Sequence, residues 1–133
     1  MCAQLDRGLP GDIETYLKSL KRTLGSIAVV LFGSRATDSQ NLRSDCDLMV
    51  IADGLPIDFW ERQEFLWRGK PSSVDAIGLT REEVRQMINR GLILDALLQG
   101  RVIHGDISEL TDLARTYVEK SGLVRTPAGY VHI

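Results

Sequence analysis

The sequence predicts an α/β fold, with a short mixed β-sheet and helices mainly on one face of that sheet. Three observations lead to this prediction. Residues 27–32 form a continuous apolar run of the kind found in strands that are buried on both faces. Similar runs at 46–52 and 72–79 alternate with segments of helical periodicity. Alternating strands and helices are typical of α/β sandwiches.

The first half of the chain predicts two helices and two strands. Apolar residues at helical spacing predict a helix over 12–24, which Gly25 ends. The strand at 27–32 follows, and a second strand is predicted over 46–52. Segment 57–68 has a moderate helical periodicity and is predicted as the next helix.

The second half continues the alternation. Segment 72–79 is predicted as a third strand, and Thr80 with Glu83 forms a capping box that opens a helix. The remaining predicted elements are a helix over 92–99, a short strand over 102–104, and a last helix capped by Asp106 and Glu109. The tail from Ser121 onward lacks clear periodicity, and we expect it to be loose or to pack on a partner.

Size and composition predict one domain over residues 1–133, with a core over about 12–105 and a C-terminal helix and tail over 106–133. The formal net charge of −2 disfavours general nucleic-acid binding. No signal-peptide pattern and no apolar stretch near the roughly 18 residues of a membrane span is visible, so we expect no membrane contact. Two cysteines form no disulfide framework, which predicts a reducing cytoplasm.

Three polar features accompany the predicted strands: Gly33 with Ser34, Asp45 with Asp47, and Asp75. Because side chains alternate along a strand, Asp45 and Asp47 share one face. If the third strand pairs beside the second, Asp75 presents a third carboxylate to the same point. Clustered carboxylates repel each other unless a cation neutralises them, and Mg²⁺ prefers oxygen ligands. Three carboxylates suit a two-metal site for phosphoryl chemistry, and Gly33 with the Ser34 hydroxyl suits a triphosphate.

Residues 31–52, LFGSRATDSQNLRSDCDLMVIA, resemble the signature of the polymerase-β-type nucleotidyltransferase superfamily. That signature is a Gly-Ser pair, a short gap, and an Asp-x-Asp that leads into an apolar strand. The later VDAIGL segment resembles the strand that carries the family's third carboxylate. The Phe-Gly-Ser-Arg-Ala opening is most similar to the minimal nucleotidyltransferases of prokaryotes. The resemblance covers about residues 12–105 and implies the polymerase-β-type nucleotidyltransferase fold.

The resemblance also implies roles for individual residues. The acids that would bind two Mg²⁺ ions, with Mn²⁺ as an alternative, and carry the catalysis are Asp45, Asp47 and Asp75. Of these, Asp75 would ligate the catalytic ion and orient or deprotonate the acceptor hydroxyl. The residues that would bind the triphosphate are Gly33, Ser34 and Arg35. Many relatives continue with Ala-Arg-Gly, and residues 35–38 depart from this pattern. Contacts to the triphosphate beyond Ser34 therefore stay open.

The implied reaction is transfer of a nucleoside monophosphate, AMP in the first place, from ATP or another nucleoside triphosphate to a hydroxyl, with release of pyrophosphate. Minimal nucleotidyltransferases commonly occur as the antitoxin beside a HEPN-type ribonuclease toxin, and some transfer AMP to it. We therefore expect a protein partner, either a HEPN-type toxin or a second copy in a homodimer. Two alternatives stay open: a small-molecule adenylyltransferase of the aminoglycoside type, and a non-catalytic partner-binding module of the same fold.

Other features have structural interpretations. His104 lacks metal-ligand spacing with any Cys or His and is predicted to be structural. The charged residues around 81–85 are interpreted as helix capping and solvated pairs. An aromatic group either packs in the core with one ring exposed, or forms a surface for base stacking or a protein partner: Phe59, Trp60, Phe65 and Trp67.

Overall fold

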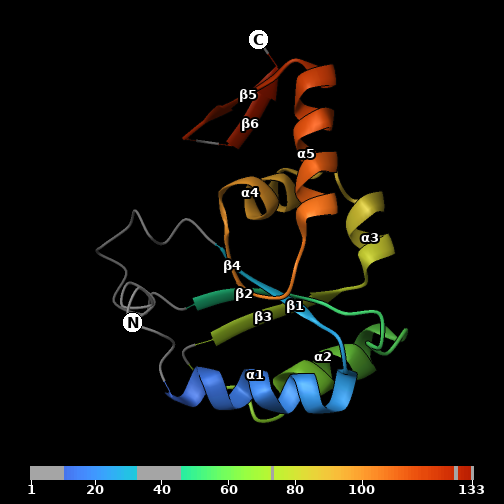
Figure 1. The fold of residues 1–133 in the computed structure, drawn as a ribbon, viewed down its shortest axis with the longest axis vertical. Helices are drawn as coiled ribbons and strands as arrows, with labels where there is room; N and C mark the ends of the chain where they lie inside the picture. The colour runs from blue at the N-terminus through green and yellow to red at the C-terminus, as the bar shows by residue number, and fades with distance from the viewer. Residues whose placement is uncertain (1–10, 33–45, 73, 128, 133) are drawn as a thin grey trace.

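The protein is built around a four-stranded mixed sheet (Figure 1). The computed structural model describes residues 11–32, 46–72, 74–127 and 129–132. The sheet order is β3-β2-β1-β4, with β1 (Ala28–Phe32), β2 (Cys46–Ile51), β3 (Val74–Leu79) and β4 (Arg101–His104). Strand β1 is antiparallel to β2 and β4, whereas β2 and β3 are parallel. The predicted α/β class with a short mixed sheet is confirmed.

Helices cover both faces of this sheet (Figure 1). Their bounds are α1 (Gly11–Leu24), α2 (Phe59–Trp67), α3 (Arg81–Gln86), α4 (Gly91–Gln99) and α5 (Ser108–Ser121). Helices α1 and α2 lie on one face, and α3, α4 and α5 lie on the other. This distribution differs from the prediction that the helices lie mainly on one face. None of the helices within the described ranges is both long enough and apolar enough to span a bilayer.

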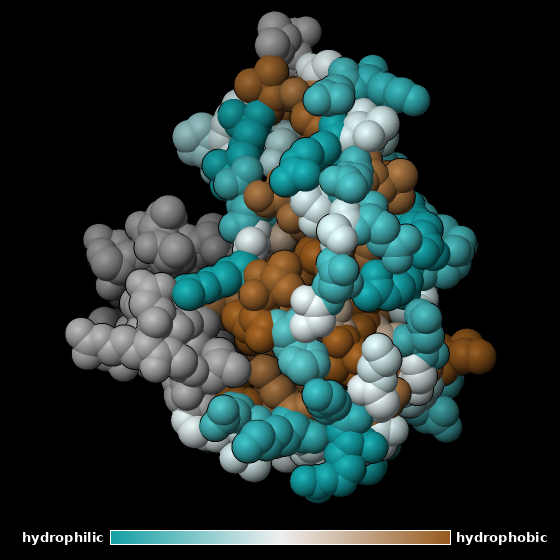
Figure 2. All heavy atoms as spheres, viewed as in Figure 1, coloured by the Kyte–Doolittle hydropathy of each residue, from teal (hydrophilic) through white to brown (hydrophobic). Residues whose placement is uncertain are grey.

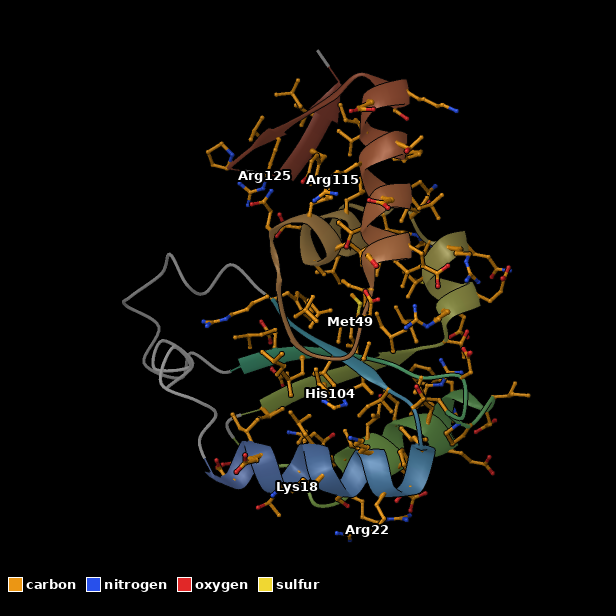
Figure 3. The ribbon with its side chains drawn as sticks, viewed as in Figure 1. Lys18, Arg22, Met49, His104, Arg115 and Arg125 are labelled. Carbon is orange, nitrogen blue, oxygen red and sulfur yellow. The ribbon has the colours of Figure 1, made fainter. Side chains whose placement is uncertain are left out.

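The central strands are apolar on both sides, which explains why both faces need a helical layer. Val29 and Leu48 pack in the core beneath α1 and α2. Val30 and Met49, the next residues along the same strands, pack in the core on the side of α4 and α5. Figure 3 shows Met49 pointing to the α4–α5 layer and His104 pointing to the α1 layer. The apolar run predicts strands that are buried on both faces, and helices cover both faces of the sheet.

The C-terminal segment forms a β-hairpin and is not a loose tail. Strands β5 (Leu123–Thr126) and β6 (Gly129–His132) pair antiparallel. Leu123 packs against the core on the α4–α5 side. Arg125 forms an ion pair with Asp95 of α4 at 3.1 Å. The hairpin is therefore part of the fold of this chain, and the expectation of a loose tail is wrong.

Gly100 lies where the end of α4 meets β1. A β-carbon at this position would lie 2.3 Å from the carbonyl oxygen of Ala96 and 2.6 Å from Cγ1 of Val30. Only glycine permits such a close approach of backbone to backbone and side chain. The close approach places the end of α4 against Val30, two residues before Phe32 ends β1.

Candidate active site

Asp47 and Asp75 lie side by side on two parallel strands. They are direct Cα partners in the β2–β3 register, and neighbouring strands are about 4.8 Å apart. Met49 and Ile77, two residues further along each strand, belong to the core on the α4–α5 side. Because alternate residues of a strand share a face, Asp47 and Asp75 point to that same side of the sheet. The third strand thus pairs beside the second, which is the condition set above for Asp75 to approach the Asp-x-Asp segment.

The end of β1 meets this carboxylate pair. Phe32, the last residue of β1, is the Cα partner of Asp47. In the chain, Phe32 is followed directly by the Gly-Ser segment of the predicted triphosphate site. The other predicted site residues lie outside the described residues: Gly33, Ser34, Arg35 and Asp45. Within the described residues, the candidate site therefore consists of Phe32 at the end of β1, Asp47 near the start of β2 and Asp75 near the start of β3.

The electrostatics of the pair favour a bound cation. Asp75 is exposed and Asp47 is half-buried. Ionised carboxylates opposite each other on neighbouring strands repel. A divalent ion would relieve this repulsion, and carboxylate oxygens are the ligands that Mg²⁺ prefers, so the donor chemistry fits. Within the described ranges no group of three or more Asp, Glu, His or Cys side chains is arranged to hold a metal, and the predicted third acid, Asp45, lies outside them.

Lys70 binds the backbone at the start of β3, next to Asp75 in the chain, and is not among the predicted site residues. Its Nζ donates a hydrogen bond to the carbonyl oxygen of Val74, and another to that of Pro71 at 3.3 Å. Val74 directly precedes Asp75, so these bonds hold the start of β3 where Asp75 is presented. A lysine next to a proline, in the turn that enters a strand, is the sequence signal that would have identified it.

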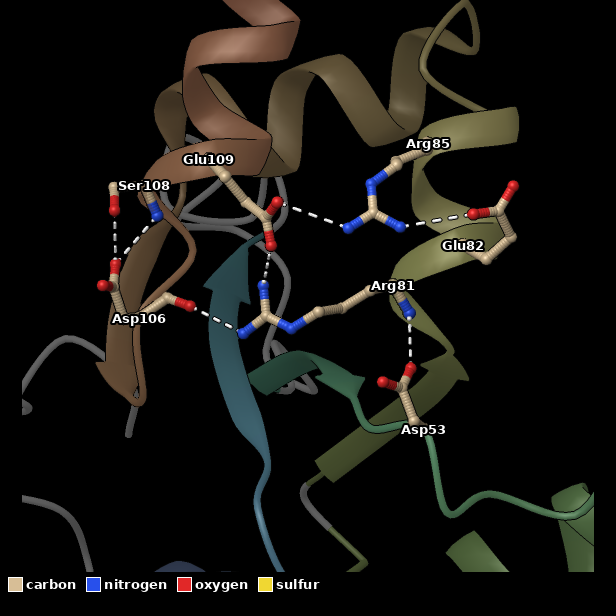
Figure 4. A network of polar contacts seen from close by, with 7 residues as sticks. All are labelled: Asp53, Arg81, Glu82, Arg85, Asp106, Ser108 and Glu109. Atoms are coloured by element: carbon tan, nitrogen blue, oxygen red, sulfur yellow. Dashed lines mark hydrogen bonds and ion pairs between the residues drawn. The ribbon is translucent and has the colours of Figure 1, made fainter.

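A separate polar network lies at the other end of β2 and β3 (Figure 4). Arg81 donates to Glu109 at 3.1 Å and to the backbone carbonyl of Asp106 at 2.8 Å. Its backbone N–H donates to Asp53 at 3.2 Å. Arg85 forms an ion pair with Glu109 at 3.3 Å. The network joins α3 and α5 to the loop after β2, so its function in the fold is to hold these elements together.

A hollow of about 260 Å³ lies in this network and is lined by Arg81, Asp106, Ser108 and Glu109. Hydrogen bonds from the Ser108 hydroxyl and N–H lower the pKa of Asp106, so this carboxylate stays charged and engaged. The charged groups of the hollow bond to one another, and they lie far along the strands from Asp47 and Asp75. The hollow is therefore not the candidate site. The predicted capping and pairing of residues 81–85 is confirmed by these ion pairs and by the capping box.

Fold and site together define an α/β domain that presents paired carboxylates on neighbouring parallel strands. Residues 13–127 match the family described as nucleotidyltransferase domain. The chain belongs to this family, and its class of activity is nucleotidyl transfer. The matched range contains Asp47, Asp75 and the whole Gly-Ser to Asp-x-Asp segment. The superfamily membership predicted from the signature is confirmed.

Among solved structures, the chain is similar to one from the crystal structure of a toxin-antitoxin with AMP-PNP, with a TM-score of 0.50 and 20% sequence identity. The match covers 80% of this chain and 85% of that chain. At this identity the likeness shows the shared fold alone. Among curated proteins, none matches this chain.

Proposed function

We propose that the protein transfers AMP from ATP to a hydroxyl of a partner protein in a reaction that depends on Mg²⁺. The observation that carries the proposal is the Cα pairing of Asp47 with Asp75 within a nucleotidyltransferase domain. In this reaction the acceptor oxygen bonds to the α-phosphorus of ATP. The bond from that phosphorus to the oxygen bridging to the β-phosphate breaks, and pyrophosphate leaves. The acceptor proton passes to the carboxylate or water at Asp75.

The proposed roles follow the positions of the acids. Asp47, together with Asp45, would hold the ion that accompanies the triphosphate, and Asp75 would face the acceptor hydroxyl. When bound, Mg²⁺ or Mn²⁺ supplies charge stabilisation for the attacking and leaving oxygens. The residues proposed to bind the triphosphate, from the sequence motif, are Gly33, Ser34 and Arg35. Lys70 would keep the start of β3, and with it Asp75, in register.

The proposed partner is a HEPN-type toxin, for which this chain would be the antitoxin in the cytoplasm. Two observations support it. The Phe-Gly-Ser-Arg-Ala signature resembles the minimal nucleotidyltransferases that occur beside such toxins. A protein of similar fold has been solved as a toxin-antitoxin with AMP-PNP. Residues 1–133 would form one nucleotidyltransferase domain.

The test is transfer of label from α-labelled ATP. Wild-type protein is incubated with Mg²⁺ and three separate acceptors, namely a purified HEPN-type protein, an aminoglycoside and an RNA. We expect labelling of the protein acceptor, and loss of labelling by orders of magnitude for Asp75→Asn because its role is greatest in the transition state. The matched control is Asp112→Asn, an acid on the exposed side of α5. Transfer by Asp75→Asn at the wild-type rate would overturn the assignment of this residue.

The same assay separates the alternative functions. Labelling of the aminoglycoside alone would indicate a small-molecule adenylyltransferase. Absence of transfer to all three acceptors would favour a non-catalytic partner-binding module, provided that nucleotide binding is absent as well. Calorimetric titration with a non-hydrolysable ATP analogue, with Mg²⁺ and then with EDTA, decides that point. Equal binding under both conditions would remove the metal role from Asp47.

A further inference from the structure

Helix α2 presents a ridge of large apolar side chains to solvent. Trp60 and Trp67 are 75% and 72% exposed, and they lie about two helical turns apart on one side of α2, turned away from the buried Leu66 by roughly a quarter to a third of a turn. Phe59, whose ring contacts that of Trp60, is 60% exposed, and Ile57, just before the helix, is 94% exposed. We call Ile57, Phe59, Trp60 and Trp67 the tryptophan ridge. Of the two interpretations given to the aromatic group, core packing is wrong for Phe59, Trp60 and Trp67.

The tryptophan ridge does not belong to the carboxylate site. Helix α2 covers the sheet face on which Leu48 and Val74 are buried. Asp47 and Asp75 point to the opposite face, toward the layer of α3, α4 and α5. A base of a nucleotide bound at the carboxylates cannot stack on side chains that lie beyond the sheet. The ridge is therefore a surface for something other than the nucleotide.

Helix α1 lies beside α2; its first turn carries Asp12 and Glu14, and its second half is basic. The hydroxyl of Tyr16 on α1 donates to the carbonyl oxygen of Leu66 on α2, so the two helices are joined. Figure 3 shows Lys18 and Arg22 of α1 pointing away from the sheet, and Figure 2 shows this layer as largely hydrophilic. Lys21 is exposed on the same helix. None of these three cations forms an ion pair with another described residue.

The solvent side of α2 is acidic. Glu61 and Glu64 are exposed within the helix that carries Trp60 and Trp67, and neither pairs with a cation of the described chain. The layer over this sheet face thus carries an acidic aromatic helix next to a basic helix. A two-fold axis perpendicular to such a face brings each acidic helix onto the basic helix of the other copy.

We infer that the tryptophan ridge is the interface of a symmetric dimer, in which α2 of each copy packs on α1 of the other. Glutamates of α2 then meet Lys18 and Arg22, and the indole faces of Trp60 and Trp67 receive the same cations. The three aromatic side chains of the ridge contribute roughly 400 Å² of exposed surface per copy, from the area that aromatic side chains bury. A stable interface needs about 800 Å² per partner, so the ridge supplies about half and the charged helix surfaces supply the rest.

The first test uses the fact that both tryptophans of the protein lie on the ridge. In sedimentation and light scattering we expect a particle with twice the chain's mass of 14.8 kDa, which dissociates on dilution. Tryptophan emission should shift to longer wavelength over the same dilution, because the indoles return to water. Trp60→Glu with Trp67→Gln should be monomeric at every concentration.

The second test exchanges charges between the two helices. One variant carries Glu61→Lys and Glu64→Lys, and the other carries Lys18→Glu and Arg22→Glu. Each variant alone places like charges on both facing helices and should be monomeric. When they are mixed, each α2 meets an α1 of opposite charge at both contacts, so a heterodimer should form. All four positions are exposed, and circular dichroism with thermal melting verifies that each variant folds.

Several results would overturn the inference. The inference is wrong if the wild-type protein is a monomer at all concentrations. This holds whether the tryptophan emission indicates exposed indoles or indoles covered by another part of the chain. A dimer whose emission does not change on dilution would place the interface elsewhere. Failure of the charge-exchanged pair to associate would remove the α1–α2 contact. None of these measurements depends on nucleotide, metal or transfer activity, so they stand apart from the proposed function.

Discussion

Replacing Asp75 by Asn should stabilise the metal-free protein, although it removes a residue of the proposed active site. Asp47 and Asp75 are Cα partners on neighbouring strands and point to the same face. Like charges directly opposite each other in a sheet destabilise by about 0.2–1 kcal/mol. Because Asp75 is exposed, solvent and salt screen part of the repulsion. We therefore expect a gain of about 0.5 kcal/mol, or about 2 °C in melting temperature, for the Asn variant in EDTA.

Mg²⁺ should reverse the order of stability of the two proteins. A ligand at ten times its dissociation constant stabilises the folded state by about 1.4 kcal/mol. Wild-type protein should gain this stability in urea unfolding with MgCl₂, whereas Asp75→Asn should gain much less because one ligand is lost. The control Asp112→Asn should behave as wild type with and without the ion. If Asp75→Asn is less stable than wild type in EDTA, the two carboxylates do not repel each other. If both proteins respond equally to Mg²⁺, Asp75 does not bind the ion.

Other predictions concern the polar contacts that join the helices to one another. Arg62 donates to Glu83 at 2.7 Å and its side chain is 12% exposed, so Arg62→Met should cost about 2–4 kcal/mol in urea unfolding, whereas Arg115→Met, in an exposed pair, should change stability by less than about 0.5 kcal/mol. The hydrogen bond from Arg62 lowers the pKa of Glu83 below its usual 4.5; the stability lost in Glu83→Gln should therefore be full above pH 4.5 and disappear as pH falls through the lowered value. Tyr16→Phe should cost about 1–2 kcal/mol, since it leaves the carbonyl oxygen of Leu66 without its buried donor. Burial raises the pKa of Tyr16 to about 12, so wild type should lose stability as pH rises from 10 to 12, and Tyr16→Phe should lack this loss when both are followed by thermal melting.

Local sequence patterns predict most elements because their causes are local. The apolar periodicity of 12–24 is observed as α1, and the capping box of Thr80 and Glu83 is present in the structure. The hairpin after α5 escapes this reasoning because its strands are short and carry no apolar alternation. Its turn residues, Pro127 and Gly129, are the overlooked signal. What orders the hairpin is its packing on α4 and α5, which no local pattern contains.

For the candidate site, the sequence by itself determines which residues can carry the chemistry. The order Gly-Ser, Asp-x-Asp and a later Asp in an apolar strand already indicates phosphoryl chemistry, because side-chain chemistry and strand alternation are properties of the chain; nucleotidyl transfer is what the resemblance of this order to the family signature implies. Strand pairing does not follow from these local properties, since a carboxylate at position 75 has many conceivable neighbours. Only the tertiary structure decides that β3 lies parallel to β2 with Asp75 opposite Asp47, and that Lys70 holds the start of that strand. It also decides that Trp60 and Trp67 face water, because the helical period leaves open which side of a weakly amphipathic helix the sheet will bury.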